Sequence, residues 1–235
     1  MGIRRGSIST PIIADGLVFN VDAANRASTV QNPNIQSTQD TISGATGTFS
    51  TKPIWSNDEI SPSFLSDGSD SRIIMSSLTP YSSDDPHTYS AWINYDVGTS
   101  YKWILNNGNL HEGDSLILFS NRIGYFWNGG NAVKKGTITL NPDTWYNFTV
   151  CYHGSSLTYD MYVNGVLDTS SDTSSPTAGS GTTWTATNSN PSIASWYNGN
   201  YDFQGNIACV HVYNRSLSAN EVLHNYNALK SRFGL

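Results

Sequence analysis

One two-residue turn limits the fold of this chain more than any other feature. Asn164 and Gly165 lie between two strand-like runs, residues 157–163 and 166–169. A type I′ turn needs a positive φ angle at both central residues, and Asn-Gly adopts such angles at little cost. We therefore predict a β-hairpin here, with antiparallel strands on both sides of the turn.

Period-two alternation of apolar residues indicates strands along most of the remaining chain. It is clearest on one face of two runs, at Leu17, Phe19 and Val21 and at Tyr89, Ala91, Ile93 and Tyr95. Further strand-like runs cover residues 64–75, 102–107, 115–120, 122–128, 145–153 and 206–215. Aromatic residues form 12% of the chain, and their large rings suit a pleated sheet. Many short strands joined by turns predict an all-β sandwich.

A helical pattern follows near the C-terminus. Ser218 precedes Glu221 by three residues, the spacing of a capping box, and Leu217 and Val222 occupy the positions of a hydrophobic staple. One apolar stripe at helical spacing consists of Val222, Leu223, Tyr226 and Leu229. Gly234 lies just past its end. We expect one short amphipathic helix that packs by one face against the sandwich.

The length of 235 residues suits a single large β domain. Residues 1–13 show no apolar periodicity, so we predict an N-terminal arm over 1–13 and one domain over 14–235. Two polar stretches, 28–62 and 169–190, are predicted as long surface loops. The arm lacks the apolar core of a signal peptide, and no run approaches the ~20 apolar residues of a membrane span. We predict neither an export signal nor membrane insertion.

Charge and cysteine content exclude several kinds of partner and site. Charged residues make up 13% of the chain, and the net charge of −6 is spread thinly, which argues against a nucleic acid or an anionic membrane as partner. Cys151 and Cys209 are the two cysteines, and they lack the CxxC spacing of a zinc site. Without an export signal, two cysteines favour free buried thiols over a disulfide.

Several segments, taken in order, resemble the LamG-like family of concanavalin A-like jelly-roll proteins. The resemblance extends over about residues 14–235 and includes the runs 16–28, 64–75, 88–96 and 145–168. Its most specific part is the closing motif, formed by Gly205, Ile207, Val210, Val212, Tyr213, Asn214, Arg215, Leu217, Ser218 and Glu221. The resemblance implies a concanavalin A-like jelly-roll β-sandwich of two antiparallel sheets with one short C-terminal α-helix.

The runs 16–28 and 225–235 also resemble segments of virion proteins of tailed phages, especially phages of marine bacteria. This resemblance implies a capsid decoration, head-fibre or tail-fibre module on the virion, assembled in the host cytoplasm without a signal peptide. The N-terminal arm would then contact other capsid or tail proteins. A homo-oligomer is compatible with a fibre, although no heptad or glycine repeat in the sequence requires one.

The acidic residues lack the arrangement of a glycosidase. Glucanases on this fold resemble one another in an E-x-D-x-E strand, whose carboxylates act as nucleophile and general acid. That spacing does not occur here, and Glu112 and Asp114, at i and i+2, lie in an apparent glycine-flanked turn. The five histidines are scattered, and His211 and His224 are expected at the surface or in hydrogen bonds rather than as bases. We therefore predict that the protein is not an enzyme.

A calcium site is suggested by resemblance alone. The family often holds Ca²⁺ in an Asp-Gly-x-Asp turn, which Asp67 and Asp70 resemble, and their carboxylates would be suitable oxygen ligands. The alternative is that both residues make Asx-type turn hydrogen bonds. Because the dense acidic spacing of a dedicated loop is missing, the turn is favoured, and no cofactor is predicted with certainty.

Two segments combine aromatic and polar side chains as a sugar site requires. The first contributes Trp196, Tyr197, Asn198, Tyr201 and Asp202, and the second contributes Trp127 and Asn128. Aromatic faces can stack on sugar rings while amides and carboxylates hydrogen-bond hydroxyl groups. The alternative is that these rings complete the core at strand ends.

Two functions are therefore open from the sequence. The first is a structural virion protein, with a host-surface polysaccharide as a further partner. The second is a carbohydrate-binding lectin module outside a virion. The lectin module requires a working sugar site, whereas the structural virion protein does not.

Overall fold

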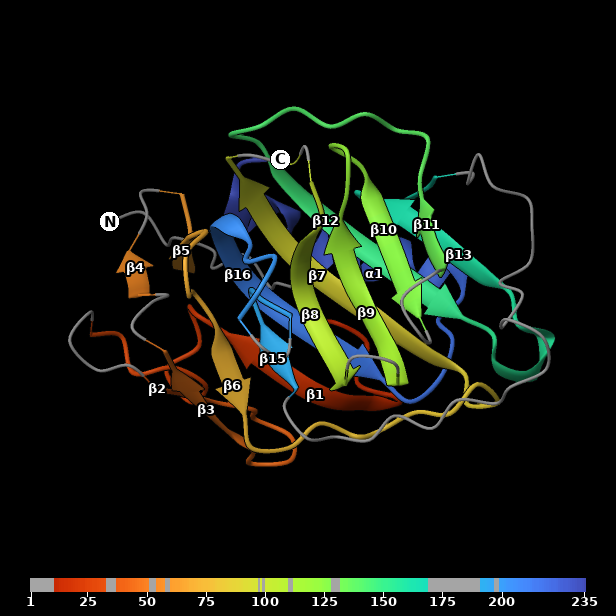
Figure 1. Cartoon of the computed structure of the whole chain (residues 1–235), viewed down its shortest axis with the longest axis horizontal. Coiled ribbons are helices and arrows are strands. Elements are labelled where there is room, and N and C mark those ends of the chain that lie inside the picture. The colour runs from red at the N-terminus through yellow and green to blue at the C-terminus, as the bar shows by residue number, and fades with distance from the viewer. Residues whose placement is uncertain are drawn as a thin grey trace, which may run out of the picture.

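The described residues form two antiparallel sheets and one α-helix (Figure 1). The computed structural model describes residues 11–32, 37–50, 54–57, 60–96, 98, 100–109, 112–127, 132–168, 191–196 and 199–235. The predicted all-β sandwich with a short C-terminal helix is confirmed. The predicted loop 169–190 lies outside the described residues, as do residues 1–10 of the predicted arm.

The first sheet has eight strands, with β1 (Leu17–Asp22) beside β16. The other strands run in the order β14 (Val166–Leu167), β13 (Tyr159–Val163), β12 (Trp145–Tyr152), β7 (His87–Tyr95), β16 (Gln204–Tyr213), β5 (Pro62–Asp67) and β4 (Ile54–Asn57). A short 3₁₀ helix, η1 (Gly154–Ser156), joins β12 to β13.

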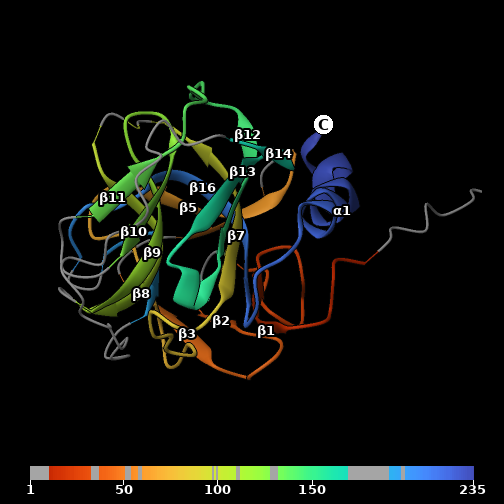
Figure 2. The same ribbon diagram turned by 90° about the vertical axis from the view of Figure 1, so that its right-hand side faces the viewer.

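The second sheet also has eight strands and lies against the first (Figure 2). Its order is β11 (Ala132–Lys135), β10 (Ile123–Trp127), β9 (Glu112–Leu118), β8 (Lys102–Asn109), β15 (Ser192–Ile193), β6 (Ile73–Met75), β3 (Thr46–Phe49) and β2 (Ser37–Gln39). Helix α1 (Ala219–Leu229) and the 3₁₀ helix η3 (Lys230–Phe233) lie on the first sheet, on the side away from the second.

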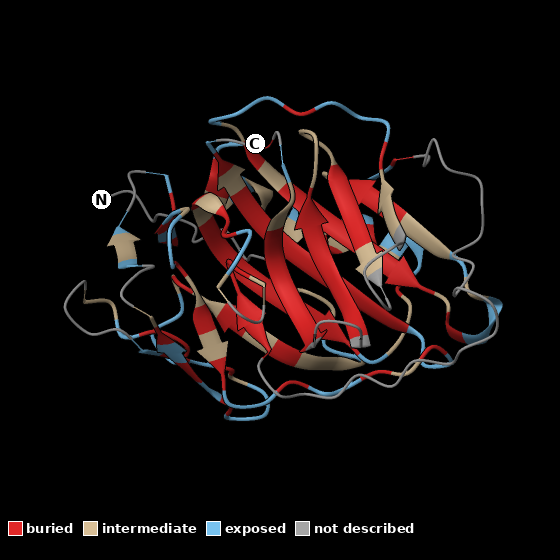
Figure 3. Cartoon of the chain, in the orientation of Figure 1, coloured by how far each residue is buried: buried red, intermediate tan, exposed pale blue. Residues whose placement is uncertain are grey.

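The core lies between the sheets, and the central strands are buried along most of their length (Figure 3). The predicted face of β7 points into it, because its four alternating residues, Tyr89, Ala91, Ile93 and Tyr95, are fully buried in the main cluster. Trp92 points the other way and stacks on Phe233, with ring centroids 4.0 Å apart and planes 10° apart. Both faces of β7 are therefore covered by apolar side chains.

The predicted alternation in β1 is confirmed at Phe19 and Val21 and is wrong at Leu17. The register passes from Leu17 opposite Tyr213 to Phe19 opposite Val212, so one extra residue forms a β-bulge. The bulge changes the phase of the strand: Phe19 and Val21 enter the core between the sheets, whereas Leu17 packs with Tyr213 beneath the helix.

The predicted hairpin is present between β13 and β14. Asn164 has a φ angle of 52° and Gly165 a φ angle of 74°, which are the left-handed conformations that a type I′ turn needs. The Asn164 side chain also accepts a hydrogen bond from the Asn147 amide at 2.8 Å, which fixes the turn to β12. Local backbone preference thus sets the strand pairing at this edge.

The C-terminal helix begins as the sequence predicts. Ser218 and Glu221 form the reciprocal capping box, and Leu217 and Val222 share one buried cluster. Leu223 is 43% exposed, so its assignment to the buried stripe was wrong: the face toward the sheet is completed by Phe233 instead. No helix in the described ranges is long and apolar enough to cross a membrane.

The segment before β1 is held by this helix. The Pro11 carbonyl lies 2.9 Å from His224 Nε2, and the Ile13 amide donates to Asn225 Oδ1 at 2.8 Å. Tyr213 donates its hydroxyl hydrogen to the Ile13 carbonyl at 3.1 Å. The chain therefore enters the domain on the helix side of the sandwich.

Both cysteines are free and buried, as predicted. They lie in the first sheet, where burial raises the pKa of Cys151 to about 12. Burial likewise lowers the pKa of His211 to about 4, so this histidine is a neutral interior residue at neutral pH and not a surface one.

A polar cluster centred on Asp114 lies inside the sandwich. Glu112 and Asp114 begin strand β9, so the predicted turn at this place was wrong. Asp114 is 1% exposed and accepts hydrogen bonds of 2.6 Å from the Tyr89 and Tyr125 hydroxyls. It also pairs with His87 Nε2. Several donors converge on this carboxylate, which offsets the free energy of removing it from water.

The first prediction concerns Asp114. Replacing it with alanine leaves the surrounding donors buried without an acceptor, so Asp114→Ala should lower the free energy of unfolding by about 3–5 kcal/mol in urea titrations. The matched control is Asp160→Ala, which removes a half-exposed carboxylate 3.2 Å from His153 and should cost less than about 1 kcal/mol. Equal effects would contradict the central role of Asp114.

The second prediction concerns the ion pair that anchors the helix. Arg215 Nη2 lies 2.7 Å from Glu221 Oε1, and this hydrogen bond lowers the pKa of Glu221 from 4.5 to about 2. The stabilisation is complete above pH 4.5 and is lost as the pH falls toward 2. Glu221→Gln should therefore be less stable than wild type by about 1 kcal/mol at pH 7.

Urea unfolding across this pH range gives the test. The difference between wild type and Glu221→Gln should shrink as wild-type Glu221 protonates, and a difference that does not change with pH would argue against the ion pair. Asp15→Asn is the control, because Asp15 also contacts Arg215, at 2.9 Å, but is 86% exposed at its side chain.

Candidate functional site

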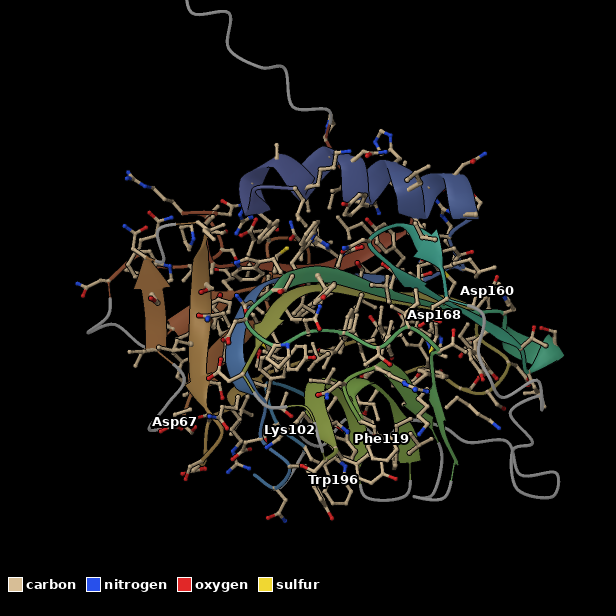
Figure 4. All side chains as sticks on the ribbon, turned by 90° about the horizontal axis from the view of Figure 1, so that it is seen from above. Asp67, Lys102, Phe119, Asp160, Asp168 and Trp196 are labelled. Atoms are coloured by element: carbon tan, nitrogen blue, oxygen red, sulfur yellow. The ribbon has the colours of Figure 1, made fainter. Side chains whose placement is uncertain are left out.

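Six aromatic side chains gather on the outer face of the second sheet and on the loop after β15. We call them the aromatic patch; they are Tyr101, Trp103, Phe119, Phe126, Trp196 and Tyr201. Figure 4 shows Phe119 and Trp196 on the side of the molecule that lies away from helix α1. The patch and the C-terminal helix are thus on opposite sides of the sandwich.

Trp103 is the ring that joins the patch together. Its centroid lies 5.4 Å from Trp196, 5.3 Å from Tyr201 and 5.3 Å from Phe126. Tyr101 stacks on Phe119 with centroids 4.0 Å apart and planes 7° apart, and meets Tyr201 edge-on. The rings form one continuous surface and not separate contacts.

A β-bulge decides that Trp103 faces outward. The register passes from Trp103 opposite Ile117 to Leu105 opposite Leu116, which leaves Ile104 as the extra residue. Leu105 and Leu116 belong to the core between the sheets. Without the bulge, Trp103 would share the face of Leu105 and point into the core.

The loop that carries the two predicted rings is fixed in a tight turn. Trp196 accepts a hydrogen bond from the Gly199 amide at 3.1 Å, and the Trp103 amide donates to the Tyr201 carbonyl at 3.1 Å. The ring centroids of Trp196 and Tyr201 lie 5.7 Å apart. Tyr201 is 49% exposed, so its ring is accessible to a ligand.

The other predicted sugar-site residues fall in different places. Asp202 is buried beneath the patch, where one carboxylate oxygen accepts from the Ser71 amide at 3.4 Å and the other has no hydrogen-bond partner. Trp127 lies at the end of β10, opposite Asp114 and Ala132. Tyr197, Asn198 and Asn128 lie outside the described residues.

The predicted calcium turn lies beside this loop. Asp67 Oδ1 accepts hydrogen bonds from the Ser69 amide at 3.1 Å and from Ser71 Oγ at 2.7 Å, which are Asx-turn contacts. Asp70 has a φ angle of 48° within the same turn. In the described part of the chain no three acidic, histidine or cysteine residues are grouped as metal ligands. The two carboxylates would supply only part of the 6–8 oxygen ligands that Ca²⁺ takes.

Four rings of the patch were not predicted from the sequence, namely Tyr101, Trp103, Phe119 and Phe126. Each belongs to or adjoins a strand-like run, where an aromatic residue points to the core as often as to solvent. For Tyr101 and Trp103, the signal that separates the two faces is the register of β8 against β9, which depends on the bulge. A pattern within one strand does not contain it.

Comparisons with known proteins agree with this fold. The family model described as the concanavalin A-like lectin/glucanases superfamily matches residues 67–223. Among curated proteins, none matches the sequence.

Solved structures with the same fold are similar to this chain at low sequence identity. A Trypanosoma rangeli sialidase in complex with sialic acid matches with a TM-score of 0.65 and 15% identity, over 96% of this chain and 36% of the sialidase. The chain thus spans about a third of that enzyme.

Two shorter proteins also match. Domain 4 of AbnA, a GH43 extracellular arabinanase from Geobacillus stearothermophilus, in complex with arabinotriose, gives a TM-score of 0.61 at 13% identity, over 89% of this chain and 98% of the domain. The binding domain of Paraclostridial Mosquitocidal Protein 1 gives a TM-score of 0.65 at 16% identity, over 91% of this chain and 52% of that one. With the family model covering most of its length, the chain belongs to the concanavalin A-like lectin/glucanase superfamily.

Proposed function

We propose that this protein is a carbohydrate-binding module that holds its ligand on the aromatic patch. The observation that carries the proposal is the contact of Trp103, Trp196 and Tyr201 on the outer face of the second sheet, with Tyr201 half-exposed. The apolar face of a pyranose or furanose ring packs well on such rings, because both surfaces give up water and gain dispersion contacts.

The way in which the patch is supported suits binding. Trp103 is 3% exposed and lies on β8, which is paired with β9 on one side and with β15 on the other. Rings held by a sheet and by a fixed turn lose little conformational freedom when a ligand arrives. The match to an arabinanase domain solved with arabinotriose supports the proposal through the fold alone.

We propose binding without catalysis. The sequence contains three glutamates, at positions 59, 112 and 221, and none of them forms the E-x-D-x-E spacing of glucanases. Asp114, near the start of β9, is buried and held by the hydroxyls of two tyrosines. It is therefore placed to stabilise the fold and not to meet a glycosidic bond.

The third prediction tests the patch. Trp196→Ala should raise the Kd for a bound glycan about tenfold or more, because a large desolvated ring often carries a major share of binding free energy. A glycan array identifies the ligand, and isothermal titration then compares the variants. Tyr201→Ala should weaken binding as well.

Leu223→Ala is the matched control. Leu223 is an exposed apolar residue on helix α1, on the opposite side of the sandwich, so its removal should leave binding unchanged. Thermal unfolding of each variant shows whether the fold survives. Binding that is absent in wild type, or is unaffected by both substitutions in the patch, would exclude this site.

Display on a virus particle is the second candidate function. It is supported by the resemblance of residues 16–28 and 225–235 to tailed-phage virion proteins. One structural observation also favours it: residues 11–13 are tied to helix α1, so the chain enters opposite the aromatic patch. Attachment at the N-terminal side would leave the patch facing outward.

The fourth prediction tests this attachment. Deletion of residues 2–10 keeps the contacts of Pro11 and Ile13 with the helix and should abolish incorporation into particles, while glycan binding in solution stays unchanged. Quantitative mass spectrometry of purified particles measures incorporation. Wild-type incorporation of the shortened chain would rule out the arm as the anchor.

A further inference from the structure

Two cationic side chains border the aromatic patch on its β10 and β11 side. Phe119 and Arg122 exchange backbone hydrogen bonds of 3.0 and 3.1 Å across the turn between β9 and β10. Directly opposed residues of an antiparallel pair point to the same face, and Phe119 lies on the outer face. Arg122 is therefore placed on the outer face beside it.

Lys135 reaches the same ring from the neighbouring strand. It pairs with Gly124, which has no side chain to separate Lys135 from Phe119. Lys135 Nζ lies 5.3 Å from the centroid of the Phe119 ring, a distance at which a cation is attracted to an aromatic face. Phe119 in turn stacks on Tyr101, which meets Tyr201. The cations and Tyr201 thus stand at opposite ends of one row of rings.

Neither of these two charges has a carboxylate partner among the described residues, in contrast to the two arginines at the C-terminal end. Arg215 pairs with Glu221 at 2.7 Å and Arg232 with Asp22 at 2.8 Å. Within the described residues, neither Arg122 nor Lys135 forms an ion pair. The chain as a whole carries a net charge of −6. Two positive charges without a carboxylate partner therefore lie at the edge of the patch, in a protein of net negative charge.

We propose that the aromatic patch takes an acidic saccharide, whose rings stack toward Trp196 and Tyr201 and whose carboxylate lies between Arg122 and Lys135. This inference rests on the proposed carbohydrate-binding function. A guanidinium presents paired N–H donors that match a carboxylate, and an ammonium adds a point charge. Because the cations and Tyr201 lie at opposite ends of the row, an oligosaccharide of more than one unit fills the site.

Matched polysaccharides give the experiment. Polygalacturonate, alginate and hyaluronate are each compared with the carboxyl-reduced form of the same polymer, which keeps the sugar backbone and removes the charge. Affinity electrophoresis should show at least about tenfold tighter binding of one or more acidic forms. Arg122→Gln combined with Lys135→Gln should remove that preference and leave binding of the neutral form within about twofold.

Lys230→Gln is the matched control. Lys230 also places its ammonium over an aromatic ring, 5.5 Å from the centroid of Tyr226, but on the C-terminal helix side. Its removal lowers the positive charge by one without touching the patch, so the preference for acidic polymers should persist. Dextran sulfate beside dextran shows whether sulfate replaces the carboxylate, and polyglutamate tests for simple attraction to a polyanion.

The outcomes separate this inference from the proposed function. Equal binding of the acidic and reduced polymers, dependent on Trp196, would overturn the acidic ligand and keep the carbohydrate-binding function. Binding of polyglutamate as tight as that of the polysaccharides, or a preference unchanged by the double substitution, would also overturn it. Binding of dextran sulfate without binding of any carboxylated polymer would overturn the carboxylate ligand in favour of a sulfated one. The absence of binding to every polysaccharide would reject both proposals.

Discussion

The burial of both faces of the first sheet is the constraint on which the rest of this structure depends. Tyr95 of β7 faces the second sheet, while Trp92 of the same strand lies beneath Phe233 and Tyr226 of the C-terminal segment. A sheet covered on both sides has little surface left for a ligand. The second sheet is covered on its inner face by the first sheet. The aromatic patch lies on its outer face. The C-terminal helix therefore covers the outer face of the first sheet and leaves that of the second sheet as the surface where the proposed ligand would bind.

The interior of the sandwich contains a charged group that a purely apolar core would not need. Asp114 is surrounded by the hydroxyls of Tyr89 and Tyr125 and by His87. Burial and the negative charge of Asp114 raise the pKa of Tyr125 well above its ordinary value, so this tyrosine stays protonated and continues to donate. Such a satisfied network favours one register of the strands over others, because a slip would leave its donors and acceptor buried without partners. Its isolation from solvent also distinguishes it from a catalytic centre.

The aromatic patch joins strand residues with a loop. Trp103 lies at the start of β8 and Tyr101 directly precedes that strand, whereas Trp196 and Tyr201 come from the turn after β15. The sheet holds the first pair rigidly, and the hydrogen bond from Trp103 to the Tyr201 carbonyl holds the loop against it. A surface assembled in this way keeps its shape before a ligand arrives. In the proposed site, the cations at its far edge would add a charge preference that stacking alone does not provide.

The sequence by itself determined the features that depend on a few neighbouring residues. The turn at Asn164 follows from backbone sterics, and the helix start at Ser218 follows from a hydrogen bond between residues three positions apart. The tertiary structure decided the faces of Leu17 and Trp103, because each lies at a bulge whose position depends on the partner strand. It also decided that Asp114 lies in the core and not in a turn. Local sterics act within a few residues of the chain, whereas strand register and burial are set by contacts between residues far apart in it, and the aromatic patch depends on the latter.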